Sequence, residues 1–337
     1  MIVVFVWLML AHDPDGGQPL VVVDIERADQ LTTGSVDGTA ASQDIQTDQT
    51  DGHASPGSAP YSRFDGGNPD LIETSRYGPL PRATADNTPL SAYARPLSQA
   101  QAGASLPKIA FIIGDLGRDP RGSATAVNLL PADVTLAVSA NSPHAQAWLN
   151  EARAEGHEVL LQTGSEPGDG LASPAAGGHL ILSTTRSTPI EKLHWQMSRA
   201  VGYFGIASTL HSTARADIPE LASIFHDLRT RGLGYFELGG PGTAVQNIAQ
   251  AAGLHYAEAD LVIDAQPSPA AIEASLNRLV EIARVQGIAI GSGSASQMTV
   301  EQLSRWLERQ NQKSFVVVPA SAVLETPTMK NASDHAR

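Results

Sequence analysis

From Lys108 onward, strand-like apolar runs alternate with helix-like segments, and this alternation limits the possible folds more than any other feature of the sequence. The apolar runs are KIAFIIGD, VTLAVS, HEVLLQT, YFGIAS, LGYFEL, ADLVIDA, IAIGS and FVVVPAS. Strands buried on both faces have nearly continuous apolar sequence, whereas strands with one face in water alternate between apolar and polar residues. Seven or eight strand–helix units of this kind predict a parallel sheet covered by helices. We expect an α/β fold, with the sheet closed or nearly closed into a (β/α) barrel of seven or eight strands.

Helix-start signals support the alternation. Thr188, Pro189 and Glu191 have the spacing of a capping box, in which the first and last of these side chains bond each other's backbone N–H groups. Ser142 followed by Pro143 predicts a second helix start, with the helix ending near residue 156.

Composition and motifs exclude several classes of protein. The chain has no cysteine, which rules out disulfide scaffolds, thiolate zinc sites, iron–sulfur clusters and cysteine nucleophiles. It has 22 basic and 35 acidic side chains, which argues against a nucleic-acid partner. No GxGxxG follows the first strand, and the Gly-rich segments GGPGTA and GSGSAS are neither P-loops nor nucleophile elbows.

The first third of the chain differs from the rest in amino-acid composition and in its pattern of apolar residues. Residues 1–26 begin with the apolar run MIVVFVWLML, about half the length that crosses a bilayer. Three interpretations stay open: a buried strand, an uncleaved signal, or the end of a membrane anchor. Residues 27–105 are rich in Ser, Thr, Gly, Pro and Asp and predict a disordered acidic linker, since they offer little apolar surface to bury. Residues 106–325 are expected to form the barrel and 326–337 a disordered tail.

In such barrels the chemistry lies at the carboxyl ends of the strands. Strand ends therefore bring four carboxylates to the mouth, Asp115, Glu166, Glu237 and Asp264, which could act as general acid and base or as ligands of a hard metal ion. Asp115, Glu237 and Asp264 are the candidate catalytic residues. Polar residues near these ends are candidates for substrate binding: Asn141, Glu166, Ser208, His211 and Ser292. Helix-capping or turn roles are open alternatives for the carboxylates.

The ten histidines include no pair three to five residues apart, so the sequence has no HxxxH metal site on one helix. His157 follows a helix-ending glycine and precedes a strand, which places it at the opposite end of the barrel with a structural role. His144, His194 and His226 fall on predicted helices and are expected to be exposed or half-buried.

The segments IAFIIGDLG and VTLAVSANSPHAQAWLNEARAEGHEVLLQTGSEP resemble the start of the divergent polysaccharide deacetylase family, whose pattern reads like IAIVIDDLG, TLAFLPYAP and GHEVLLHLPMEP. Later segments, from GYFGIAS to TVEQLSRWL, follow the family's order, so the resemblance covers roughly residues 108–324. It implies a deacetylase-type (β/α) barrel in carbohydrate metabolism. It also implies a bacterial envelope protein, secreted or anchored behind a linker.

Active members of the wider superfamily are thought to hold a divalent metal with an Asp pair and histidines, and a metal-bound water attacks the acetamide. This chain departs from that pattern at several positions. Gly114 stands in place of the first Asp, the Ala207–Thr209 segment lacks the histidine, and the late histidine is replaced near Ser292. The resemblance therefore implies that Asp115, Glu237 and Asp264 are the remaining ligands, a set that suits magnesium or calcium better than zinc.

The leading hypothesis is a deacetylase-like envelope protein with weak or lost amide hydrolysis, which makes a pseudoenzyme one outcome. One alternative is a non-catalytic module that binds a glycan or an envelope protein at the same mouth. A less favoured one is a glycoside hydrolase built on two of the carboxylates, which needs them about 5–5.5 Å or about 6.5–9.5 Å apart. The expected partners are a peptidoglycan-related glycan or an envelope protein, with membrane association through the N-terminus. The sequence does not define the oligomeric state.

Overall fold

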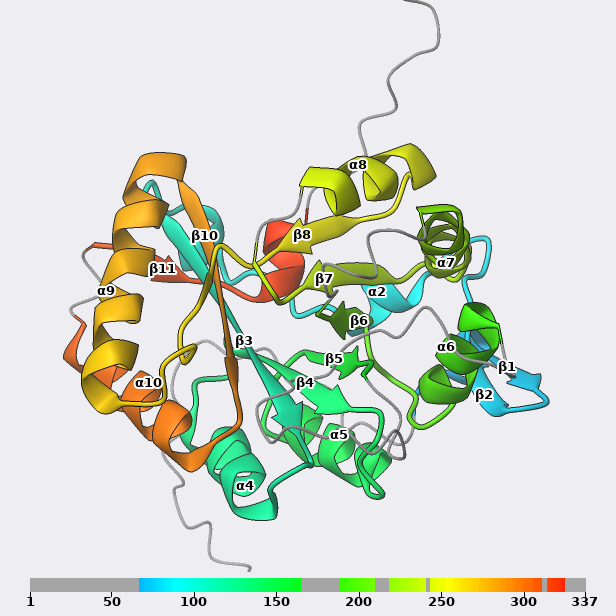
Figure 1. Cartoon of the computed structure of the whole chain (residues 1–337), viewed down its shortest axis with the longest axis horizontal. Coiled ribbons are helices and arrows are strands. Elements are labelled where there is room, and N and C mark those ends of the chain that lie inside the picture. The colour runs from blue at the N-terminus through cyan, green and yellow to red at the C-terminus, as the bar shows by residue number, and fades with distance from the viewer. Residues whose placement is uncertain (1–66, 165–187, 210–217, 241–242, 311–313, 325–337) are drawn as a thin grey trace, which may run out of the picture. The chain divides into compact units, whose positions relative to one another are not determined.

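A curled, all-parallel sheet forms the centre of the protein, and helices cover its outer face (Figure 1). The computed structural model describes residues 67–164, 188–209, 218–240, 243–310 and 314–324. The strands follow the order β8-β7-β6-β5-β4-β3-β10-β9, and β11 pairs with the beginning of β3. Their bounds are β3 Lys108–Leu116, β4 Thr135–Ser139, β5 Val159–Gln162, β6 Gly205–Ser208, β7 Gly234–Glu237, β8 Tyr256–Glu258, β9 Leu261–Val262, β10 Ile288–Ser294 and β11 Val316–Val317.

The two edges of this sheet are consecutive pieces of chain. β8 pairs with β7 and β9 pairs with β10, and only Ala259 and Asp260 separate β8 from β9. The Ala259 N–H still donates to the β7 residue Glu237, whereas the Asp260 N–H donates to Ile290 of β10. One interrupted strand thus changes partner half-way and joins the two edges. The predicted α/β barrel is confirmed, with this seam between β7 and β10.

The helices that cover the sheet lie where the strand–helix alternation predicts them. They are α4 Pro120–Leu129, α5 Ala145–Ala154, α6 Pro189–Met197, α7 Ile218–Thr230, α8 Thr243–Ala252, α9 Pro269–Gln286 and α10 Gln297–Arg309. The capping box of α6 is confirmed, because Thr188 and Glu191 bond each other's backbone N–H groups. The predicted start at Ser142 is wrong: α5 begins at Ala145, and the Ser142 hydroxyl accepts a hydrogen bond from the N–H of His144 instead.

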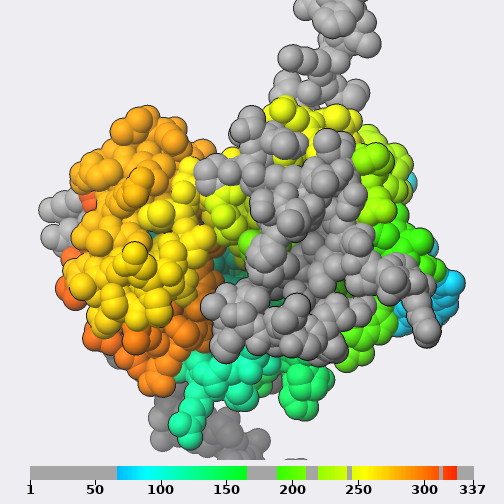
Figure 2. Space-filling model, in the orientation of Figure 1, coloured from blue at the N-terminus to red at the C-terminus, as the bar shows by residue number. Residues whose placement is uncertain are grey.

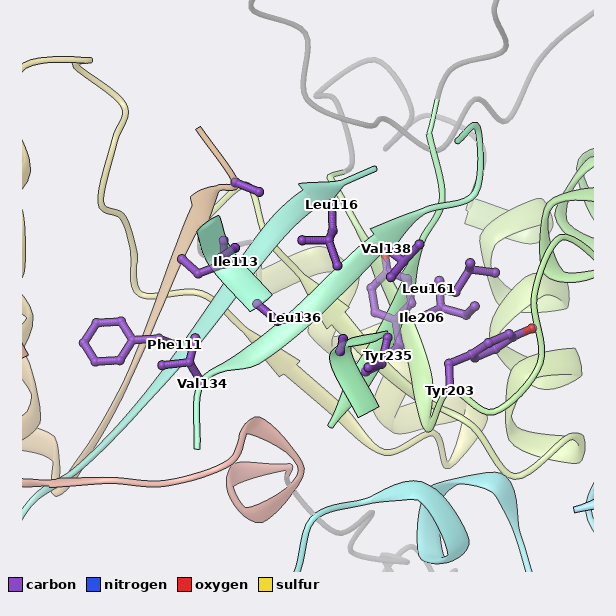
Figure 3. Close-up of a cluster of buried hydrophobic side chains, with 14 of the residues drawn as sticks. Phe111, Ile113, Leu116, Val134, Leu136, Val138, Leu161, Tyr203, Ile206 and Tyr235 are labelled. Atoms are coloured by element: carbon purple, nitrogen blue, oxygen red, sulfur yellow. The ribbon is translucent and has the colours of Figure 1, made fainter. Parts of the chain in front are cut away.

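Two apolar cores lie on the two faces of the sheet. The outer core packs strand residues such as Phe111, Val138 and Tyr235 against the helices (Figure 3). The inner core fills the barrel with residues that alternate with these along the strands: Ala110, Ile112, Ala137, Leu160, Ala207, Phe236, Ala257 and Ile290. Both faces of each strand are therefore buried, which explains the continuous apolar runs in the sequence.

A folded arm precedes the barrel. It consists of η1 Pro69–Leu71, the antiparallel hairpin of β1 Ile72–Ser75 and β2 Gly78–Pro81, and the short helices α2 Pro89–Tyr93 and α3 Gln99–Ala102. Leu71, Leu80 and Tyr93 are buried and attach the arm to the cores. The prediction of a disordered linker is wrong for residues 67–105, because these few apolar anchors suffice once the barrel is present to receive them. Residues 1–66 and 325–337 lie outside the described part of the chain.

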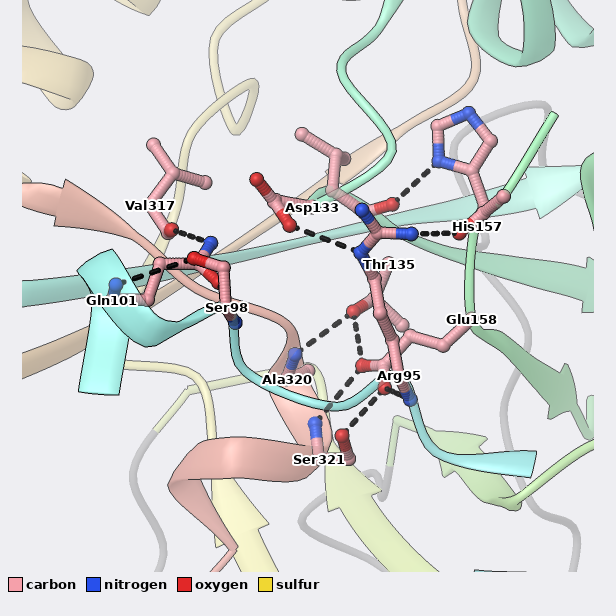
Figure 4. Close-up of polar contacts among 12 residues, drawn as sticks. Arg95, Ser98, Gln101, Asp133, Thr135, His157, Glu158, Val317, Ala320 and Ser321 are labelled. Carbon is pink, nitrogen blue, oxygen red and sulfur yellow. Dashed lines mark hydrogen bonds and ion pairs between the residues drawn. The ribbon is translucent and has the colours of Figure 1, made fainter. Parts of the chain in front are cut away.

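A network of buried polar groups closes the end of the barrel where the strands begin (Figure 4). Glu158 is fully buried and accepts hydrogen bonds from the Thr135 hydroxyl, the Arg95 N–H, and both the N–H and the hydroxyl of Ser321. It thereby joins β4 and β5 to the arm and to η3 Ala320–Val323. Burial raises the pKa of this carboxyl above its usual value.

His157 belongs to the same end of the barrel, as predicted. Its Nδ1 lies 2.8 Å from the carbonyl oxygen of Val134 and its Nε2 3.2 Å from that of Val127. Burial lowers the pKa of the imidazole, and a neutral ring carries one N–H, so one of these two contacts is an N–H···O bond. The most specific motif of the sequence, GHEVLL, is therefore structural.

Three further histidines have the expected exposure, since His144 and His226 are exposed and His194 is half-buried. His194 and His226 lie on helices as predicted, whereas His144 is the N-cap residue that precedes α5. Across the described ranges, none of the helices combines the length and the apolar composition needed to cross a membrane.

Candidate functional site

The carboxyl ends of the strands present two rows of side chains, because neighbouring residues of a strand point to opposite faces. The inner row continues the inner core by one step beyond residues such as Ile112, Leu160 and Ile290. Its members are Gly114, Ser139, Gln162, Ala207, Leu238 and Ser292. This row has no ionisable side chain. Its polar groups are one amide and two hydroxyls, and the Ser292 hydroxyl donates to the carbonyl oxygen of Leu238 at 2.9 Å.

Asp115 lies at the rim of this row in a distorted part of β3. The pairing of β3 with β4 shifts register between Ile113 and Leu116, and Asp115 has a φ of 59°. Asp is one of the few residue types that adopt this left-handed conformation as single residues. Its carboxylate is 23% exposed, and its Oδ1 lies 3.2 Å from a guanidinium nitrogen of Arg118. Asp115 is the next-to-last residue of β3, one residue before the end of the strand, and its catalytic role stays a prediction.

Gln162 is a site residue that the sequence analysis missed. Its side chain is buried at the end of β5, and its Oε1 accepts a hydrogen bond from the Asp115 N–H. Its Nε2 lies 3.5 Å from Asp115 Oδ1. A signal was present: the family pattern GHEVLLH has a histidine where this chain has Gln162.

Glu237 belongs to the outer row and is directed away from the barrel interior. It accepts a hydrogen bond from the Tyr235 hydroxyl at 3.3 Å and one from the N–H of Gly239 at 3.1 Å. The Tyr235 ring packs against Phe225 of α7 and stacks on Tyr256. Burial raises the pKa of Tyr235 well above its ordinary value, and the negative charge of Glu237 acts in the same direction.

Ser208 shares the outer row with Glu237, since the two residues are partners in the β6–β7 register. It is fully buried. A substrate in the barrel mouth would meet the inner row, so the alternation places Ser208 and Glu237 behind the sheet rather than beside Gln162.

Asp264 fastens the loop that follows β10. Its Oδ2 accepts hydrogen bonds from the N–H and the hydroxyl of Ser294 and from the Thr299 hydroxyl at 2.8 Å. Ser294 is the register partner of Gly114, so Asp264 supports the rim of the mouth. These contacts correspond to the turn or capping alternative for this carboxylate.

One of the remaining predicted residues lies at the rim of the mouth, and two lie outside the described part of the chain. Asn141 follows β4 in a tight turn, closed by the Ser142 N–H donating to the carbonyl of Ser139 at 3.0 Å. Glu166 and His211 lie outside the described residues. In the orientation of Figure 1, the space-filling view shows the surfaces of α9 and α10 on the left and those of α6 and α7 on the right (Figure 2).

The donors that the structure describes at the mouth do not fit the metal that the family pattern implies. Within the described ranges, no three His, Asp or Glu side chains are grouped as metal ligands. Beside Asp115, the positions of the pattern's acid and histidine hold Gly114 and Gln162, a residue without a side-chain donor and a neutral amide. The three-carboxylate metal site stays a prediction.

Comparison with known proteins identifies the family. Residues 111–324 match the sequence profile of a family described as divergent polysaccharide deacetylase. The chain belongs to this family. The divergent polysaccharide deacetylase segment thus begins inside β3 and ends just after η3, and it includes every strand from β3 to β11.

This divergent polysaccharide deacetylase is similar to proteins from several bacteria, among them one with a crystal structure. The uncharacterized protein YibQ of Escherichia coli K12 is 24% identical over 228 residues, which cover 67% of this chain and 70% of YibQ. An uncharacterized protein of Haemophilus influenzae is 22% identical over 201 residues, which cover 59% of this chain and 71% of that protein. The crystal structure of an uncharacterized protein from Agrobacterium tumefaciens C58 is 32% identical, with a TM-score of 0.65, covering 73% of this chain and 99% of that one.

Proposed function

We propose that this divergent polysaccharide deacetylase acts on envelope carbohydrate with weak or no amide hydrolysis, and that it uses the strand-end mouth to bind glycan. Membership of the family supports a carbohydrate-related role. The inner row of the mouth supports the loss of chemistry, because it offers hydroxyls and one amide where a hydrolase would need a metal ion and a base.

The observation that carries this proposal is the pair of Gly114 and Gln162 beside Asp115. Hydrolysis of an acetamide requires a base next to the attacking water and an electrophile on the carbonyl oxygen. Among the residues of the mouth that the structure describes, Asp115 is the one placed to act as a base, and its carboxylate is paired with Arg118 and faces the Gln162 amide. Carboxylate, amide and hydroxyl groups together form hydrogen bonds with neutral polar ligands, of which sugar hydroxyls are one kind.

An envelope location is part of the proposal. The ten apolar residues MIVVFVWLML at the start of the chain and the acidic segment after them are consistent with attachment at a membrane. Cell fractionation of the full chain tests this: we expect it in the envelope fraction, and recovery entirely in the soluble cytoplasmic fraction would contradict the location.

Two assays on the purified full chain test the function. Release of acetate from chitooligosaccharides and from peptidoglycan fragments is measured with added magnesium, calcium or zinc, beside metal content. Binding of the same glycans is measured by calorimetry in the presence of a chelator. We expect binding that survives chelation, and acetate release that is weak or absent and is not increased by any of the added metal ions.

The outcomes separate the alternatives. Acetate release that needs a stoichiometric metal ion, both lost in Asp115→Ala, would show an active deacetylase and refute the pseudoenzyme. Absence of both glycan binding and acetate release would refute the carbohydrate role and favour a protein partner at the mouth. Cleavage of glycosidic bonds in the same fragments would instead support the glycoside hydrolase alternative.

A further inference from the structure

Gly114 is glycine for a reason that lies in another strand. Its backbone is not in the left-handed region, so the local conformation admits a side chain. A Cβ atom added at this position would lie 2.7 Å from Oε1 of Gln162, 3.3 Å from its Cδ and 3.4 Å from its Nε2. Carbon and oxygen atoms without a bond between them do not approach to 2.7 Å without displacement, so the Gln162 side chain occupies the space of a side chain at 114.

Gln162 cannot move aside without consequence. Its Oε1 accepts the hydrogen bond of the Asp115 N–H, the residue next to Gly114, and the side chain is buried. Asp115 is the one residue other than glycine with positive φ in the described part of the chain, and it stands in the register shift of β3. A non-glycine residue in this conformation persists only when its surroundings hold it.

We propose that Gln162 and Gly114 form an interdependent pair that positions Asp115 at the mouth through hydrogen bonds from the protein itself, in place of a metal ion. In this arrangement the Gln162 oxygen satisfies the Asp115 N–H and the Gln162 amide nitrogen faces the carboxylate. Gly114 leaves the room for this side chain. Gln162 is thus a positioning residue. This inference rests on the proposed function only in treating the mouth as free of metal.

A double-mutant cycle on the full chain tests the interdependence. Gly114→Ala in the natural background should displace Gln162. The loss of one buried hydrogen bond should then raise the equilibrium constant for unfolding about tenfold. In a Gln162→Ala background the same substitution meets no side chain, and it should be neutral or slightly stabilising. An equal loss from Gly114→Ala in both backgrounds would overturn the proposal.

A spectroscopic measurement separates positioning from a general structural role. Gln162→Met keeps the length of the side chain and removes the acceptor, so the Asp115 amide proton should shift upfield and exchange about tenfold faster. Gln162→Glu keeps an acceptor oxygen for this N–H but puts its second oxygen in the place of Nε2, which lies 3.5 Å from Asp115 Oδ1, so it should restore both values at a pH low enough to protonate one of the two facing carboxyl groups. Gln286→Met, the same change at an exposed site in α9, should leave the Asp115 amide unaltered. An Asp115 amide that is unaffected by Gln162→Met would overturn the proposal even if the variant is less stable.

The metal-free part of the inference is tested with metal ions alone. Addition of magnesium or zinc to the full chain should leave the amide resonances of Asp115 and Gln162 unchanged. Saturable shifts at these residues that a chelator reverses would overturn it. The outcome can be told apart from a failure of the proposed glycan binding, since a protein that binds no metal here can still fail to bind glycan.

Discussion

Glu158→Gln is expected to weaken the closed end of the barrel, where four donors converge on one carboxylate (Figure 4). Oε1 accepts from the Thr135 hydroxyl at 2.7 Å and the Ser321 N–H at 2.9 Å, and a glutamine oxygen in that place keeps both bonds. The glutamine nitrogen then replaces Oε2 and faces the Arg95 N–H. Both groups are hydrogen-bond donors, so neither can accept from the other. One buried N–H is left unsatisfied, and we expect the free energy of unfolding at pH 7 to fall by about 1–3 kcal/mol.

The pH dependence of stability provides a second, independent test of this prediction. Burial raises the pKa of Glu158 in the folded protein above the ordinary value of 4.5. The folded state therefore binds this proton more tightly than the unfolded state, a stabilisation that is complete below pH 4.5 and lost as the pH rises through the folded pKa. The glutamine variant has no such proton. The difference in unfolding free energy between the natural protein and Glu158→Gln should widen from pH 7 toward pH 4.5.

Urea unfolding followed by circular dichroism measures both quantities. Glu151→Gln makes the same change at an exposed position of α5 and serves as the matched control, with an expected effect close to zero. Equal urea midpoints for Glu158→Gln and the natural protein at pH 7 would refute the hydrogen-bond argument. A difference in unfolding free energy between the natural protein and Glu158→Gln that narrows toward pH 4.5 would refute the direction of the pKa shift.

Three further predictions concern other contacts. Asp264→Ala removes the acceptor of the Ser294 N–H, its hydroxyl and the Thr299 hydroxyl, and should cost about 2–3 kcal/mol of unfolding free energy in urea; an unchanged midpoint would contradict its structural role. Arg231→Met breaks the pairs with Glu73 and Asp227 and the bond to the Pro81 carbonyl, so limited proteolysis should cut within residues 67–105 faster while the barrel stays intact; unchanged cleavage would refute the attachment of the arm by this residue. Burial lowers the pKa of His157 below 6.5, so the unfolded chain takes up the proton first and the free energy of unfolding should fall as the pH drops below 6.5. His157→Gln should reduce that fall, measured by unfolding between pH 7.5 and 5. A fall of the same size in the variant would assign it to another group.

The barrel was predictable because its strands are recognisable one at a time. Runs such as KIAFIIGD and VTLAVS become β3 and β4 with bounds within a residue of the expectation. β8 was less visible, since Tyr256–Glu258 is short and the strand changes partner within two residues. Local sequence reports a strand's existence well, but it does not report which neighbours the strand bonds.

The site was predictable only in part, and for a physical reason. In a parallel barrel both faces of a strand are buried, so the apolar pattern carries no indication of which side faces the interior. Phe236 points inward and Glu237 outward, a difference of one residue that the sequence LGYFEL does not reveal. The role of Gln162 depends on Gly114 and Asp115 in a neighbouring region of the sheet, a relation that exists only after the strands have paired through β4.

The arm was missed because composition averages over a long segment. Residues 27–105 read as polar as a whole, yet Leu71, Leu80 and Tyr93 are enough to dock the part from residue 67 onward. Arg95 adds polar attachment through Asp133 and the Gly156 carbonyl. A few anchors stabilise such a segment when the surface that receives them is already folded.

The closed end of the barrel also decides how the protein can be attached to anything else. Gly67 lies near Val201, ahead of β6, and Leu324 lies against Gly234 at the beginning of β7. The described chain thus enters and leaves on the side where strands begin, opposite Asp115 and Gln162. A surface, a fusion partner or a support joined at either of these points would leave the strand-end mouth pointing outward, toward the surrounding medium.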